Sequence, residues 1–340
     1  MSDDGLSPRQ RLDRLDAVLR DTDAAPIDRL HAAWGLHDLF VGLTEQPPVD
    51  IADKVGDAFE ETVAPDGLAL SPFDAALCLR DAPRTYAFAE GVRRAISHMR
   101  DRHSDRPVRV LYAGTGPFAP LAVLQIPHFD ADAVQFTLLD IHPSSDLATR
   151  DVFAAMEAED LVEARHVTDA TQWSPPDPRP FDVIVAEVMQ ASLKNEPQVQ
   201  LTRALVPLLA PDGVMVPEEI ALDLVQLHTH LLVGETPAPL PAPIGRAMTL
   251  NVETARDMVT DRDIAPLPSL HVPAELASDA PLAIVTRIRT FDDVALDYGQ
   301  SGLTQPIIEH AAPIPRAGQR IDLSYRLGTH PKLLVEVAPD

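Results

Sequence analysis

The sequence has almost no cysteine and no long apolar run. Cys78 is the single cysteine among 340 residues, which excludes an intramolecular disulfide and makes a thiolate metal cluster implausible. No apolar stretch approaches the about 20 residues that a membrane-spanning helix needs. The first residues, MSDDGLSPRQRLDRLD, are charged where a secretory signal would be apolar. These absences predict a soluble, cytoplasmic protein without a membrane partner.

Basic residues are also scarce. The chain has 28 Lys and Arg against 52 Asp and Glu, which gives a formal net charge of −24. Nucleic acids and anionic membranes bind basic surfaces, so this charge argues against both as partners. Because the acids are scattered along the whole chain, we interpret them as favouring solubility rather than attraction of a basic substrate.

Three regions that differ in composition and hydrophobic pattern follow one another along the chain. Residues 1–104 contain apolar side chains at helical spacing, as in RLDRLDAVLR, and predict a helical N-terminal region. Residues 105–217 alternate short apolar runs with helical stretches, which is typical of a SAM-binding or dinucleotide-binding Rossmann-like α/β core. Residues 218–340 combine prolines with period-two runs such as LAIVTRIRTF, and predict an antiparallel, barrel-like β domain.

The apolar runs of the central region locate its strands. Short β-branched runs that alternate with helices are typical of strands buried on both faces, so we predict a parallel, doubly wound sheet. The runs are Val108–Tyr112, Phe136–Leu139, Val183–Val185 and Val214–Val216. In such a sheet, ligands bind beyond the carboxyl ends of the strands.

A glycine turn follows the first of these runs. Gly114 and Gly116 stand between that run and an expected helix, with Pro117 suited to the first helical turn. With Ala119 the segment fits G-x-G-x-x-A, and Asp140 follows about 20 residues later. The turn and the acid suit either a dinucleotide or S-adenosylmethionine (SAM), whose ribose hydroxyls the acid would bind.

Three further features favour SAM over a nicotinamide cofactor. A dinucleotide fold usually begins near the start of a chain, whereas a long helical region comes first here. Asp169, in HVTDATQW, falls at the expected end of the third strand, where it would meet the adenine. The stretch LLAPDGVMVP, a helix followed by a turn and a strand, is also common before the fifth strand of methyltransferases. We therefore predict that Gly114, Gly116, Asp140 and Asp169 bind SAM.

Two carboxylates share one loop in FDVIVAEVMQASLKNEPQV. Glu187 comes soon after the run Val183–Val185, and Glu196 completes the pattern E-x8-E, which places both at the carboxyl edge of the sheet. The donors of a guanidinium group match carboxylates in bidentate pairs, so two acids on one loop can grip this planar cation. Positioned in line with a methyl donor, the cation would react mainly because it is oriented and electrostatically stabilised. We predict Glu187 and Glu196 as the catalytic residues.

At these residues the sequence resembles the protein arginine methyltransferase family. The family pattern D-x-x-R-T-x-x-(F/Y) falls on Asp81, Arg84, Thr85 and Phe88, and the double-glutamate loop falls on Glu187 and Glu196. The resemblance implies SAM as cofactor, a contact of Arg84 with the carboxylate of its methionine part, and a guanidino nitrogen as acceptor.

The sequence also departs from the family pattern. Tyr112 stands where the family has an acid, Phe118 replaces the third glycine, and Ser301-Gly302-Leu303 takes the place of the Thr-His-Trp loop. The long helical dimerisation arm is missing or reduced to a proline segment, so a dimer is one of the oligomeric states left open. These departures favour a small molecule or a short peptide over a large protein as the acceptor.

Three alternatives stay open at this point. They are a methyltransferase that acts on another N, O or C atom with Glu187 as general base, an NAD(P)-dependent oxidoreductase, and a non-catalytic SAM-binding scaffold. His228 and His230 stand two apart, but no cysteines or obvious third ligand lie near them in the sequence, so we expect no metal.

Overall fold

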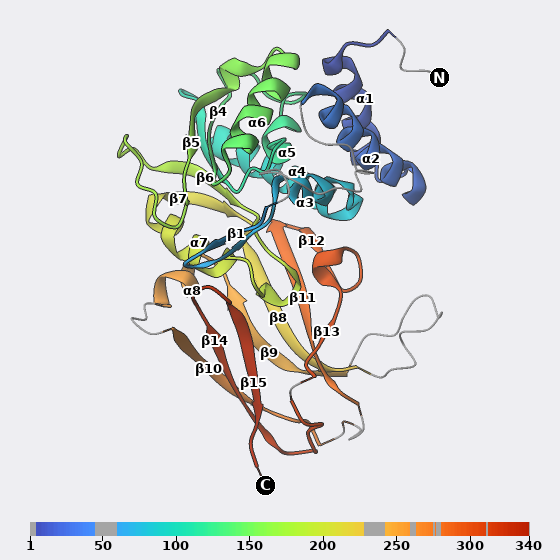
Figure 1. Cartoon of the computed structure of the whole chain (residues 1–340), viewed down its shortest axis with the longest axis vertical. Coiled ribbons are helices and arrows are strands. Elements are labelled where there is room, and N and C mark those ends of the chain that lie inside the picture. The colour runs from blue at the N-terminus through green and yellow to red at the C-terminus, as the bar shows by residue number, and fades with distance from the viewer. Residues whose placement is uncertain are drawn as a thin grey trace.

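The computed structural model describes residues 5–44, 60–227, 242–258, 263–274, 276, 280–310 and 312–339. The N-terminal helices and the parallel sheet lie side by side in the upper half of the molecule, and the antiparallel sheets form the lower half (Figure 1). This confirms the predicted α/β fold with a C-terminal antiparallel β part. His228 and His230 lie outside the described residues. Among the helices that the structure describes, none has the length and apolar character that a bilayer crossing requires.

In the residues that the structure describes, four α-helices precede the parallel sheet. They are α1 (Pro8–Arg20), α2 (Pro26–Leu43), α3 (Pro72–Leu77) and α4 (Ala82–Arg102). The start of α1 follows from its sequence, because the Ser7 side chain accepts from the Gln10 amide while the Gln10 side chain binds back to the Ser7 amide. The last turn of α4 carries Arg100 and Arg102, where basic residues suit the helix dipole.

A short β-hairpin interrupts this helical region, and the sequence analysis did not predict it. Its strands are β1 (Thr62–Ala64) and β2 (Gly67–Ala69), paired antiparallel. Three-residue strands are too short to produce a readable period-two pattern. In Figure 1 the hairpin reaches across the middle of the molecule, between the parallel sheet and the β domain.

The central sheet has five parallel strands in the order β5-β4-β3-β6-β7. They are β3 (Val108–Ala113), β4 (Val134–Asp140), β5 (Val162–Val167), β6 (Phe181–Ala186) and β7 (Leu209–Val216). The chain runs outward from β3 to β5 and then returns to β6 on the other side of β3. The order therefore reverses between β3 and β6, and the carboxyl edge at that point is where such sheets bind ligands.

Three helices connect these strands: α5 (Pro120–Val123), α6 (Pro143–Ala155) and α7 (Gln198–Leu205). The helix after the glycine turn begins at Pro120, so the prediction that Pro117 occupies its first turn is wrong. Ala119 has a left-handed conformation, with φ of 43°, and this delays the helix.

The C-terminal region forms two antiparallel sheets, ordered β12-β11-β8-β9 with β13 beside β11, and β10-β14-β15. The strands are β8 (Glu219–Gln226), β9 (Ala242–Leu250), β10 (Ile264–His271), β11 (Leu282–Phe291), β12 (Val294–Leu296), β13 (Ile307–Ile308), β14 (Arg320–Arg326) and β15 (Lys332–Val337), with helix α8 (Val252–Asp257) after β9. The buried Thr290 hydroxyl of β11 donates to the Ala87 carbonyl of α4 at 2.8 Å. The β domain is therefore attached directly to the helix that precedes the parallel sheet.

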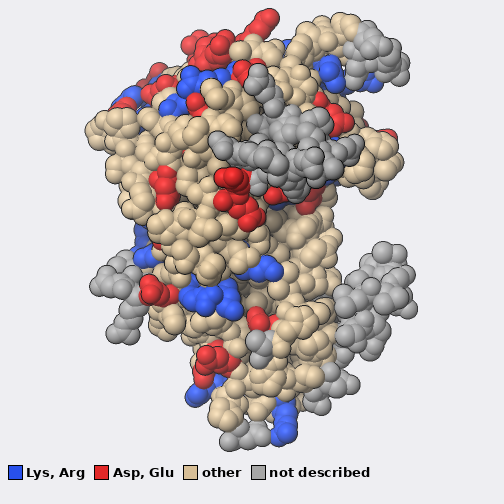
Figure 2. Space-filling view, in the orientation of Figure 1, with Lys and Arg blue, Asp and Glu red and all other residues tan. Residues whose placement is uncertain are grey.

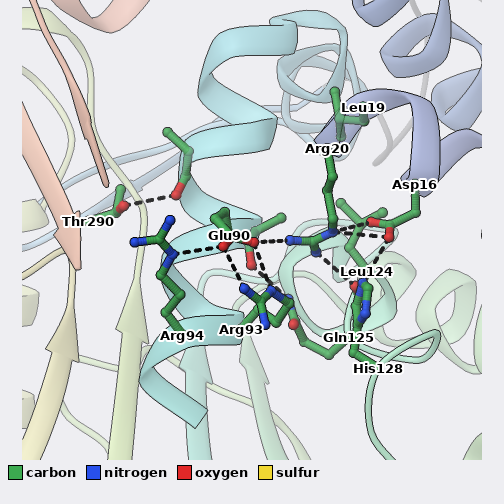
Figure 3. Close-up of polar contacts among 12 residues, drawn as sticks. Asp16, Leu19, Arg20, Glu90, Arg93, Arg94, Leu124, Gln125, His128 and Thr290 are labelled. Carbon is green, nitrogen blue, oxygen red and sulfur yellow. Dashed lines mark hydrogen bonds and ion pairs between the residues drawn. The ribbon is translucent and has the colours of Figure 1, made fainter. Parts of the chain in front are cut away.

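A buried ion network fixes α1 against α4 (Figure 3). Glu90 of α4 receives hydrogen bonds from Arg20 of α1 at 2.6 Å, from Arg93 at 2.7 Å and from Arg94 at 2.8 Å. Arg20 also contacts Asp16, whose carboxylate lies 2.8 Å from the His128 ring. Burial works to raise the pKa of Glu90, but the hydrogen bonds from Arg93 and Arg94 outweigh it and lower the pKa to about 2.

Substitution Glu90→Gln should destabilise the protein by about 3–5 kcal/mol at pH 7, because it leaves three guanidinium groups around a neutral amide. Since the pKa of Glu90 falls from 4.5 to about 2 on folding, its contribution is complete above pH 4.5 and is lost as the pH drops toward 2. Urea unfolding at pH 7 and pH 3 should therefore show a smaller difference between wild type and variant at pH 3.

The exposed Glu336→Gln on β15 is the matched control, and it should change the unfolding free energy by less than about 0.5 kcal/mol. A Glu90→Gln variant as stable as this control at pH 7 would contradict the structural importance of the network.

Candidate active site

All seven predicted site residues line one cavity at the carboxyl edge of the parallel sheet. They are Arg84, Gly114, Gly116, Asp140, Asp169, Glu187 and Glu196. The sequence brings them together because the glycine turn follows β3 and Glu187 follows β6, on the two sides of the point where the strand order reverses. On the face drawn in Figure 2, acidic and basic side chains lie at several separate places, so the acidic groups there do not form one continuous negatively charged patch.

The glycine turn is shaped by its conformation and by a close neighbour. Gly114 and Gly116 have φ of 76° and 58°, in the left-handed region that favours glycine. A Cβ at Gly114 would lie 2.2 Å from Cγ1 of Val188, the residue after Glu187. Only a glycine lets the turn after β3 come this close to the glutamate loop.

Asp140 braces the same turn. One of its carboxylate oxygens accepts from the Gly116 amide at 2.8 Å, and the other accepts from the His142 amide at 2.9 Å. A carboxylate has lone pairs beyond these two bonds, so a ligand hydroxyl can still bind it. Asp169 accepts from the Thr171 amide at 2.9 Å, directly after β5.

Arg84 and Glu187 form an ion pair across the cavity, with Nη2 of Arg84 2.5 Å from Oε1 of Glu187. Burial raises the pKa of Glu187, and Arg84 opposes that rise. Burial works to lower the pKa of Arg84, but the negative groups around it, including both glutamates, raise it overall. The guanidinium therefore stays charged, and it has further N–H donors for a ligand anion.

Glu196 forms no ion pair with any residue that the structure describes. Its side chain is buried, and its Oε1 atom has no hydrogen-bond partner among those residues. Burial raises the pKa of Glu196 to about 8, Arg84 works against this rise, and Glu187 adds to it. At neutral pH this carboxyl holds a proton, and a cation placed beside it would favour release of that proton.

The loop between the two glutamates has a strained backbone. Ser192, Leu193 and Asn195 have φ of 62°, 54° and 66°. Left-handed residues other than glycine cost roughly 1–3 kcal/mol each, although asparagine tolerates the region better. Gln198 fixes the start of the loop, because its side chain accepts from the Val188 amide and donates to the Ala186 carbonyl.

The hairpin supplies a wall of the cavity that the sequence analysis missed. Ala64 and Ala69 line the cavity, and the Leu68 amide donates to the Asn195 carbonyl at 2.7 Å. A Cβ at Gly67 would lie 2.8 Å from the Pro197 nitrogen, so this strand packs directly on the glutamate loop. In the sequence only Gly67 marks this contact, and a single glycine does not indicate which distant residue it packs against.

Two departures from the family pattern have structural explanations. Phe118, in place of the third glycine, packs against Phe40 and His37 of α2, with ring centroids 5.6 and 6.2 Å apart. Ser301, in place of the Thr-His-Trp loop, donates from its hydroxyl to Asp81 at 2.7 Å, while the Gly302 amide donates to the same oxygen at 2.9 Å. Asp81 caps α4, the helix that carries Arg84, so this segment still contacts the site region.

Two other side chains in the cavity were not predicted as ligand contacts. The buried Ser145 hydroxyl lines the cavity and has no hydrogen-bond partner in the described part of the chain. Tyr112 lines it as well, and burial raises the pKa of its phenol well above the ordinary value. Tyr112 therefore presents a neutral hydroxyl where the family pattern has a carboxylate.

Comparison with solved structures identifies the fold. The chain is similar to the Arabidopsis thaliana protein arginine methyltransferase 10, with a TM-score of 0.52 and 14% identity. It is also similar to a chain of the Trypanosoma brucei PRMT1 enzyme–prozyme heterotetramer solved with AdoHcy, with a TM-score of 0.50 and 14% identity. Each match covers 73% of this chain and 86% of the other. No protein-family model matches the chain, and no curated protein matches it in sequence. The predicted resemblance is therefore confirmed for the fold.

Substitution Glu196→Gln should stabilise the protein at alkaline pH. Because folding raises the pKa of Glu196 from 4.5 to about 8, the stability due to its bound proton is complete below pH 4.5 and is lost as the pH rises through 8. A glutamine cannot ionise, so the variant should be more stable than wild type by about 1–3 kcal/mol at pH 9. Urea unfolding at pH 6 and pH 9 measures the difference.

The exposed Glu253→Gln on α8 serves as control, since its stability relative to wild type should not change between these pH values. If Glu196→Gln and this control had the same pH dependence, Glu196 would not be a buried, proton-holding group.

Proposed function

We propose that this protein is a SAM-dependent methyltransferase whose acceptor is a guanidino nitrogen of a small molecule or short peptide. The observation that carries the proposal is a single cavity lined by two chemically different sets of residues. One set is the glycine turn, Asp140, Asp169 and Arg84. The other set is the two carboxylates of Glu187 and Glu196, of which Glu196 is buried.

The donor set fits the chemistry of SAM, which supplies an activated methyl group when bound. Arg84 offers a permanent cation for a carboxylate, Asp140 offers acceptors for ribose hydroxyls, and Asp169 offers an acceptor for an adenine amino group. The unpartnered Ser145 hydroxyl supports the presence of a polar ligand, because buried polar groups rarely lack a partner. AdoHcy in the trypanosomal complex is consistent with a ligand of this class.

The glutamates supply the acceptor side. A guanidinium has a delocalised and weakly nucleophilic lone pair, so it must be oriented rather than simply bound. Carboxylates at Glu187 and Glu196 would bind two of its nitrogens and concentrate positive charge there, which leaves the third nitrogen richer in electrons. Arg84 compensates Glu187 before the acceptor arrives, which limits the cost of a buried charge.

The pKa of Glu196 favours a second candidate as well. A carboxyl with a pKa of about 8 is matched to proton transfer near neutral pH. In its ionised form Glu196 could thus accept a proton from an amine or hydroxyl acceptor. The cofactor would be the same, but the acceptor would be neutral.

Calorimetry with AdoHcy and with NADH tests the cofactor. We expect binding of AdoHcy and no heat with NADH, and Arg84→Met should weaken AdoHcy binding about tenfold or more through loss of a charge-assisted contact. Arg150→Met, on the exposed face of α6, is the control and should bind AdoHcy like wild type. Binding of NADH alone would contradict the methyltransferase proposal.

Proton release tests the acceptor. Methylguanidine binding to the AdoHcy complex at pH 7 should release up to one proton, because the cation favours the ionised form of Glu196. Calorimetry in two buffers of different ionisation enthalpy counts that proton, and Glu196→Gln should abolish its release. If methylguanidine does not bind while a neutral amine or phenol is methylated, the guanidino acceptor is wrong and the second candidate holds.

A further inference from the structure

The glutamate loop is held in place by residues of the β domain. The Tyr325 hydroxyl of β14 donates to the Leu193 carbonyl at 2.6 Å, and the Ser192 amide donates to the Thr286 hydroxyl of β11 at 2.8 Å. A third bond runs from the Asn195 amide to the Pro331 carbonyl at 2.8 Å. Each of these bonds ends on one of the three residues that have left-handed backbone conformations.

These contacts are buried and specific. Tyr325 and Thr286 are both fully buried, and Tyr325 is among the largest side chains that are completely enclosed. Burying a polar group without a hydrogen bond costs free energy. The Tyr325 and Thr286 hydroxyls therefore favour the loop conformation in which both are hydrogen-bonded. Ser192, Leu193 and Asn195 precede Glu196 on the same loop. Their hydrogen bonds with the β domain therefore fix the position of the Glu196 carboxyl.

We propose that Tyr325 and Thr286 are positioning residues, which hold the loop in the conformation that turns Glu196 into the cavity. The inference rests on the proposed function, because Glu196 is the acceptor carboxylate there. Two separate β sheets take part, since Thr286 belongs to β11 and Tyr325 to β14. Through these two hydroxyls the β domain would act on the acceptor loop, whereas its contacts with α4 and with the Asp81 cap of that helix come from other residues, Thr290 and Ser301.

Isosteric variants test this directly. Tyr325→Phe removes one hydroxyl, and Thr286→Val removes the other at similar volume. We expect each variant to lower kcat/KM for the guanidino acceptor about threefold to tenfold, the effect of one lost hydrogen bond, with the affinity for AdoHcy within about twofold of wild type. The double variant should not be additive, because both bonds hold one loop. Tyr298→Phe is the control and should keep wild-type kinetics, because the Tyr298 ring packs against a separate small cluster of Val225, Leu227, Ala283 and Val285.

A readout without turnover separates this inference from the proposed function. Hydrogen exchange of amides 188–196 should accelerate in both variants and stay at the wild-type rate in Tyr298→Phe. Carbon-13 NMR of the Glu196 carboxyl should show its titration midpoint moving toward the ordinary value as the loop loosens. These measurements remain decisive if no guanidino compound is methylated.

Three results would overturn the inference. One is loop exchange within about twofold of wild type in the double variant, which would mean that the β domain does not hold the loop. Another is faster exchange with an unchanged Glu196 titration and unchanged acceptor kinetics, which would give the bonds a purely structural role. A loss of AdoHcy binding as large as the loss of acceptor turnover would also contradict it, because the contacts would then support the whole cavity.

Discussion

The site depends on the removal of two carboxylates from water beside a single guanidinium. Arg84 satisfies Glu187 at 2.5 Å and leaves Glu196 without an equal partner. A buried charge that lacks compensation is expensive, so Glu196 holds a proton until a cation arrives. The hairpin and the β domain bear on this imbalance, because their hydrogen bonds hold the loop that carries Glu196.

Much of the cofactor side could be predicted from the sequence because short-range patterns determine it. An apolar run locates a strand, and the residue that follows the run must lie at the carboxyl edge of the sheet. That reasoning located the glycine turn, Asp140 and Glu187 without any knowledge of distant contacts. The strand order then brought these residues to one cavity.

The supports of the site could not be predicted in the same way. Tyr325 and Leu193 are far apart in the sequence. The Tyr325 hydroxyl binds the backbone carbonyl of Leu193, which any residue type could provide, so no sequence motif marks this contact. The hairpin strands were too short for a periodic signal. Ser301 appeared only as the loss of a family motif, although its hydroxyl contacts the cap of α4. Contacts between distant segments, made with common side chains or backbone atoms, leave no local pattern.

The double attachment of Asn195 has a consequence for how the protein is made. Its carbonyl accepts from Leu68, and its amide donates to Pro331, so one residue joins the hairpin to a segment near the C-terminal end of the described chain. During synthesis the parallel sheet can emerge while β14 and β15 are still inside the ribosome. The loop that carries Glu187 and Glu196 is then made before the strands that hold it. The full set of contacts around this loop therefore forms only after the last strands have been synthesised.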